Sequence, residues 1–87
     1  MERNFQIKNQ LGLHARAAAK WVQLGNHFES SLSIRYDGQE VDGKSILDLL
    51  TLACPMGSVI MVRAEGSDAD RLIEALEGLI EDKFGEE

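Results

Sequence analysis

The feature that most restricts the fold is a β-hairpin pattern in the middle of the chain. Leu32, Ile34 and Tyr36 alternate with polar residues, which is the period of a half-buried strand. Asp37-Gly38 then supplies a dipeptide suited to a tight turn, and Glu40-Val41 returns. A hairpin with helix-forming segments on both sides suits helices packed on a mainly antiparallel sheet.

The remaining elements follow from the hydrophobic period and from helix start and stop signals. We predict strands over residues 2–8, 31–36, 40–41 and 58–64, and helices over residues 15–24, 45–53 and after residue 67. Ser45 and Ser67 each precede an acidic residue by three positions, a capping-box pattern. The last helix carries an apolar stripe formed by Ala69, Leu72, Ile73, Leu76, Leu79 and Ile80.

The element order βαββαβα predicts an α+β fold, an open-faced β-sandwich. Its four-stranded, mainly antiparallel sheet carries three helices on one face, and the other face meets water. The 87 residues form one domain, residues 1–87, without linkers or repeats. A domain this small buries roughly two thirds or less of its unfolded surface, so we expect no deep catalytic cleft.

Charge and cysteine usage narrow the class of protein. A net charge of −6 without a cluster of Lys and Arg argues against nucleic-acid binding. The most apolar region, residues 45–62, contains Asp48, Pro55 and Gly57 and falls short of a membrane span. The single Cys54 excludes an internal disulfide, and we expect it to be buried rather than reactive. The expectation is a cytoplasmic protein.

His14 is the main candidate for chemistry, because it lies between a glycine turn and a run of alanines. If a helix begins at Ala15, the imidazole sits beside backbone N–H groups that have no intrahelical acceptor. Those donors and the helix dipole suit an anion and favour the neutral imidazole that can attack phosphorus. Arg16 can add a guanidinium that matches phosphate oxygens. The plain alternative is a helix-capping histidine without chemistry.

Two segments, GLHARAAA and GKSILDLLTL, resemble the HPr family of phosphocarrier proteins of the bacterial sugar phosphotransferase system. Ser45 lies 31 positions after His14, which is the family's separation between its active histidine and regulatory serine. The resemblance covers nearly the whole chain, and the two segments together are specific.

The resemblance implies that enzyme I phosphorylates His14 on Nδ1 and that His14 passes the group to IIA-type domains. Arg16 would steady the phosphate, with the backbone of Ala15 and Ala17 beside it. Ser45 resembles the serine modified by HPr kinase/phosphorylase in lineages that have this enzyme. The expected partner interface is Lys20, Ile46, Leu47 and Leu50. We expect a monomeric carrier rather than an autonomous enzyme, with no metal and no cofactor.

Departures from the family pattern keep alternatives open. Ala17 stands where many members have proline, Leu11 where many have a small polar residue, and Asp48 enters the docking helix. Gln23 and Asn26 also replace basic residues that are frequent in the family, and together with Asp48 they would weaken steering toward acidic partners. A regulatory, nitrogen-type phosphorelay is one alternative, and a module that binds a transcription regulator through phospho-Ser45 is another. The apolar residues of the expected interface could simply be core, and the acidic tail is interpreted as a solvated end formed by Glu81, Asp82, Glu86 and Glu87.

Overall fold

The computed structural model describes residues 1–86, and within them four strands and three α-helices follow in the predicted order. The strands are β1 (Glu2–Gln6), β2 (Ser31–Tyr36), β3 (Gln39–Asp42) and β4 (Val59–Glu65). The helices are α1 (Ala15–Gly25), α2 (Ile46–Leu52) and α3 (Ala69–Glu81), and a short 3-10 helix, η1 (Lys83–Gly85), follows α3. β1 ends two residues earlier than predicted, although Ile7 still exchanges hydrogen bonds with Gly57 and Ser58.

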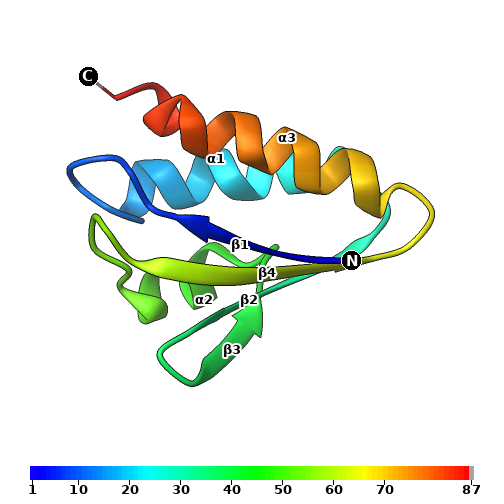
Figure 1. The fold of residues 1–87 in the computed structure, drawn as a ribbon, viewed down its shortest axis with the longest axis horizontal. Helices are drawn as coiled ribbons and strands as arrows, with labels where there is room; N and C mark the ends of the chain where they lie inside the picture. The colour runs from blue at the N-terminus through cyan, green and yellow to red at the C-terminus, as the bar shows by residue number, and fades with distance from the viewer. Residues whose placement is uncertain (87) are drawn as a thin grey trace.

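The sheet has the strand order β1-β4-β2-β3, and every neighbouring pair is antiparallel. In the register, Phe5 lies opposite Ile60, and Ile34 lies opposite both Val62 and Val41. Figure 1 shows α1 and α3 lying alongside each other over the strands. The prediction of an α+β open-faced sandwich is therefore confirmed.

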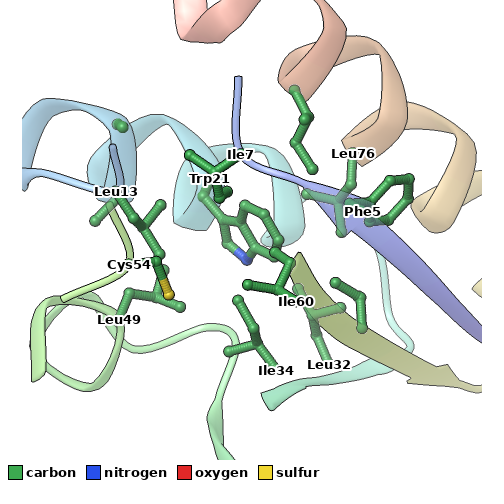
Figure 2. Packing of buried hydrophobic residues seen from close by; sticks show 14 of the residues in the cluster. Phe5, Ile7, Leu13, Trp21, Leu32, Ile34, Leu49, Cys54, Ile60 and Leu76 are labelled. Atoms are coloured by element: carbon green, nitrogen blue, oxygen red, sulfur yellow. The ribbon is translucent and has the colours of Figure 1, made fainter. Parts of the chain in front are cut away.

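The core lies between the sheet and the three helices. The strand residues that face the helices are buried: Phe5, Leu32, Ile34, Ile60, Val62 and Ala64. Trp21 of α1 is fully buried, and Figure 2 shows its indole among side chains from the sheet and from the other elements. Each large apolar side chain buried in this way contributes about 1.5–3 kcal/mol relative to an exposed one. The expected burial of Cys54 is confirmed, since its side chain is only 2% exposed.

The start of α3 differs from its prediction. Its N-cap residue is Asp68, so the predicted Ser67–Asp70 capping box is wrong. The Asp68 carboxylate instead accepts hydrogen bonds from the Ser30 hydroxyl and from the amides of Glu29 and Ser30, both at 2.9 Å. Because these bonds favour the charged form, with the Ser30 hydroxyl first and the Glu29 amide next, the pKa of Asp68 falls to about 2.

α1 and α2 run in opposite directions. The start of α2 lies beside the end of α1, where the Lys44 ammonium donates a 2.9 Å hydrogen bond to the carbonyl of Phe28. The exit from α2 lies beside the start of α1, where the Leu13 amide donates to the carbonyl of Cys54 at 2.9 Å. None of the helices in residues 1–86 has the length and apolar character that crossing a membrane requires.

Candidate functional site

The loop that leads into α1 is held tightly by backbone contacts. Gly12 has φ = +70°, a left-handed conformation that glycine adopts without steric cost. A Cβ at this position would collide with the carbonyl oxygen of Cys54 and lie 2.9 Å from Cα of Pro55. The side-chain amide of Asn9 donates a 2.6 Å hydrogen bond to the Gly12 carbonyl. The residue that follows Leu13 is therefore placed accurately.

His14 is the N-cap residue of α1, as expected. Its backbone is extended (φ −83°, ψ −178°), and its Nδ1 accepts a 3.3 Å hydrogen bond from the amide of Arg16. The amides of Ala15 and Ala17, which are also in the first turn, make no hydrogen bond to any of residues 1–86. Nδ1 thus carries a lone pair directed at the donors of the helix start, where an anion would be stabilised.

The other ring nitrogen of His14 contacts a residue that the sequence did not suggest. Nε2 pairs with the carboxylate oxygen Oε2 of Glu86, which also accepts a 3.0 Å hydrogen bond from the side-chain amide of Asn9. Only 24% of the His14 side chain and 13% of the Glu86 side chain are exposed. The ring is therefore partly covered, and the interpretation of Glu86 as part of a solvated end is wrong.

The hydrogen bonds at Glu86 lower the pKa of its carboxyl group. The bond from His14 contributes most and the bond from Asn9 adds to it, while partial burial acts in the opposite direction. Glu81 and Asp82 are exposed, as expected for the tail, and Glu81 pairs with Lys8. Glu87 lies outside the described residues.

A left-handed turn at η1 brings Glu86 to the site. Lys83 and Phe84 have φ values of +53° and +56°, and Gly85 follows with +79°. Phe84 is only 1% exposed, and its carbonyl accepts a 2.6 Å hydrogen bond from the ammonium of Lys20. Lys20, expected at the partner interface, is thus half-buried and engaged within the chain. Figure 1 shows the C-terminal end and the loop before α1 at the same end of the molecule.

Arg16 is exposed at the start of α1. Among residues 1–86 its guanidinium forms no ion pair with a carboxylate. A guanidinium in this state retains its full set of donors for an anion at Nδ1 of His14.

The exposed apolar side chains of α2 are those that the resemblance placed at the partner interface. Leu47 is 75% exposed and Ile46 is 40% exposed, whereas Leu50 is half-buried against the core. Leu11 and Met56 are also exposed, at 66% and 57%, on the two loops that meet at the Gly12–Cys54 contact. The sequence does not place Leu11 and Met56 at the interface, because it does not show that their two loops meet.

Ser45 is the N-cap residue of α2, and its hydroxyl oxygen accepts a 3.2 Å hydrogen bond from the amide of Asp48. Because α2 starts beside the end of α1, Ser45 is separated from His14 by about the length of α1, roughly 16 Å. The Asp48 carboxylate accepts a 3.3 Å hydrogen bond from the amide of Asp42, so two acidic residues lie near Ser45. The structure does not bring the two expected modification sites together.

Cys54 carries no sign of reactivity. It is 2% exposed, and burial raises the pKa of its thiol to about 11. The neutral thiol is a poor nucleophile, so its place is in the core.

A histidine that caps a helix on an open-faced sandwich, beside amides and a guanidinium without partners among residues 1–86, is an arrangement that suits a phosphocarrier domain. The family model described as "PTS HPr component phosphorylation site" matches residues 1–82. The chain belongs to the HPr family of phosphocarrier proteins.

Individual relatives agree with this assignment. The phosphocarrier protein HPr of Xylella fastidiosa is 41% identical over 87 residues, covering 100% of this chain and 98% of that protein. A crystal structure of HPr from Thermoanaerobacter tengcongensis has a TM-score of 0.96 and 44% identity, covering 100% of this chain and 98% of that one.

The family also includes similar proteins with other names. The HPr-like protein Crh of Halalkalibacterium halodurans is 42% identical, covering 93% of this chain and 96% of that protein. The phosphocarrier protein NPr of Shewanella violacea is 38% identical, covering 99% of this chain and 94% of that protein.

Proposed function

We propose that this chain accepts a phosphoryl group on Nδ1 of His14 from phospho-enzyme I and passes it to IIA-type acceptor domains. The observation that carries the proposal is the hydrogen bond from the Arg16 amide to Nδ1, which marks this nitrogen as the unprotonated one. An unprotonated Nδ1 at a helix start is a nucleophile that already faces donors for the incoming oxygens.

The transfer step follows from this geometry. The Nδ1 lone pair attacks phosphorus, the bond between phosphorus and the donor's leaving nitrogen breaks, and that nitrogen keeps the electron pair. Phosphate oxygens then replace Nδ1 as the acceptor for the Arg16 amide and accept from the amides of Ala15 and Ala17 as well, and the Arg16 guanidinium offsets their charge. The proton on Nε2 stays in place, and the reverse sequence delivers the group to the acceptor.

The exposed apolar side chains beside this site support a docking role. Ile46 and Leu47 lie on α2, and Leu11 and Met56 lie on the two loops at its exit, where a partner can cover them while it reaches His14. Leu50 adds a half-buried side chain on α2, and Lys20, whose ammonium bonds to the Phe84 carbonyl, lies on α1.

The decisive experiment incubates the protein with enzyme I and labelled phosphoenolpyruvate. Acid-labile label on the wild type that vanishes in His14→Ala is the expected result. Equal labelling of the two proteins would exclude His14 as the carrier.

Ser45 is proposed as a regulatory phosphorylation site. A phosphate there would add charge at the start of the docking helix, about one helix length from His14, and we expect slower phosphorylation of His14. HPr kinase with ATP should add acid-stable phosphate that Ser45→Ala abolishes. If the wild type takes up no acid-stable label, Ser45 acts only as an N-cap.

The similarity to NPr of Shewanella violacea favours a second candidate, a nitrogen-type regulatory relay. The same His14 chemistry would then serve a different donor. Labelling rates with enzyme I of the sugar branch and of the nitrogen branch distinguish the two, since the physiological donor should be faster by at least about tenfold.

A further inference from the structure

Glu86 and Asn9, which the mechanism leaves unused, form a hydrogen-bonded cluster with His14. It joins three parts of the chain, because Asn9 precedes the Gly12 turn, His14 caps α1 and Glu86 follows η1. Asn9 is fully buried, and its amide group donates both to the Gly12 carbonyl and to Oε2 of Glu86. Both acceptors face the nitrogen of the Asn9 side-chain amide. These acceptors fix the orientation of the amide, because its oxygen, if it took the place of the nitrogen, would face two other oxygens of the same negative partial charge.

The hydrogen bonds at His14 define one protonation pattern of the ring. Nδ1 accepts from the Arg16 amide, so it has no proton, and Nε2 faces a carboxylate, so it carries one. In the other neutral tautomer the Nε2 lone pair would face the Glu86 carboxylate, and the Nδ1 proton would face the Arg16 amide hydrogen. Both contacts would be repulsive, so Glu86 and Arg16 select the same tautomer from opposite sides of the ring.

The segment that holds Glu86 is strained, and it is held in place by burial. Each of the left-handed residues Lys83 and Phe84 costs about 1–2 kcal/mol relative to ordinary backbone. Insertion of the Phe84 ring into the core and the hydrogen bond from Lys20 to the Phe84 carbonyl oppose this cost. Strain that the surrounding structure maintains is characteristic of functional sites.

We propose that Glu86 is a positioning residue, which keeps His14 as the Nε2–H tautomer and so presents the Nδ1 lone pair to the phosphoryl donor. This inference rests on the proposed function of His14. When Nδ1 gains the phosphoryl group the ring becomes cationic, and the carboxylate opposite Nε2–H then faces a positive charge that was absent before. Glu86 therefore favours both the reactive tautomer and the phosphorylated product.

The test compares Glu86→Ala and Glu86→Gln with Asp82→Asn. Asp82 is exposed at the end of α3, so its variant removes the same unit of charge without touching the imidazole. The first measurement is the ¹⁵N NMR shifts of the two ring nitrogens of unphosphorylated His14 at a pH where the ring is neutral. We expect nearly pure Nε2–H tautomer in the wild type and in Asp82→Asn, and a substantial Nδ1–H population in Glu86→Ala.

The second measurement is the steady-state rate of labelling by enzyme I at increasing concentrations of each variant. Glu86→Ala should lower kcat about tenfold and leave KM within about twofold. Docking is intact in this variant, but a smaller fraction of His14 is in the tautomer with an unprotonated Nδ1. Glu86→Gln keeps an acceptor for Nε2–H, so it should retain the tautomer and restore part of kcat. Glu86 is the charged group that contacts the ring, and both Glu86 variants remove its charge while leaving the rest of the site unchanged.

The outcomes separate this inference from the function on which it rests. An unchanged tautomer ratio in Glu86→Ala, or an equal loss of kcat in Asp82→Asn, would overturn the positioning role. Absence of acid-labile label on the wild type would instead defeat the carrier function. The tautomer ratio would still show whether Glu86 selects the Nε2–H form, because it is measured on unphosphorylated protein.

Discussion

The starts of α1 and α2 are both capped by a side chain, but they have different surroundings. At each start, the N-cap residue has an extended backbone and its side chain accepts a hydrogen bond from an amide of the first turn. His14 accepts from Arg16, and Ser45 accepts from Asp48. At the start of α1, the amides of Ala15 and Ala17 and the Arg16 guanidinium have no partner within residues 1–86, whereas acidic residues lie near Ser45. A cap alone therefore does not make a site for an anion, and the neighbouring charges and donors decide its chemistry.

The largest expected effect concerns the charge at the first helix start. Arg16→Ala should slow phosphoryl transfer to His14 by about 100-fold, because it removes donors that match the transferred group. Stability should change by no more than about 0.5 kcal/mol, since the side chain is exposed. Rapid-quench labelling with enzyme I measures the rate, and Arg71→Ala, an exposed arginine on α3, is the control. An equal loss in both variants would mean that net charge, not position, matters.

The loop before α1 gives the next effect. Gly12→Ala should destabilise the fold by about 3 kcal/mol, through left-handed strain and collision with the Cys54 and Pro55 backbone. The midpoint of thermal unfolding should fall by about 15 °C. Gly38→Ala is the matched control, because Gly38 has φ = +82° but open space around its Cα, and it should cost only about 1 kcal/mol. Similar costs for the two variants would show that the contact with Cys54 is not tight.

The second helix start should respond through stability alone. Ser45→Ala removes the acceptor for the Asp48 amide and should cost about 1 kcal/mol in urea unfolding, with His14 labelling changed by less than about twofold. Ser67→Ala should cost less than about 0.5 kcal/mol, because Ser67 is exposed and does not cap α3. A large rate effect of Ser45→Ala would mean that the two helix starts are coupled.

The third helix start provides an effect that depends on pH and appears only in acid. The pKa of Asp68 is about 2 in the folded chain and about 3.9 in an unfolded one. Its contribution to stability is therefore complete above about pH 4 and is lost as the pH falls through 2. The stability difference between wild type and Asp68→Asn should shrink over this range, as urea unfolding at pH 5, 4, 3 and 2 can measure. Asp70→Asn, which removes an exposed carboxylate of the same helix, is the control.

Local sequence patterns predict most of the fold and the position of His14 at a helix start. The alternation around Ile34 and the Asp37-Gly38 turn specify the hairpin, and the segment from Gly12 to Ala19 specifies a histidine at a helix start. These signals lie within a few residues of what they determine, so a single sequence is sufficient.

Contacts between distant segments could not be predicted in the same way. Glu86 lies 72 positions from His14, in a tail whose acidic composition is typical of solvated ends. The buried Phe84 was the available signal, since an aromatic residue after the last helix can anchor a tail. The Ser67 prediction failed for the same reason: the Asp68 carboxylate bonds to Ser30, 38 positions away, and a local motif does not report this.

The antiparallel arrangement of α1 and α2 has a consequence for recognition. His14 and Ser45 lie at opposite ends of α1, and the exposed side chains of α2 lie between them. A protein interface of ordinary size, about 800 Å² on each partner, is wide enough to cover both ends at once. A single bound protein can therefore contact His14 and Ser45 at the same time, although the two residues do not touch each other.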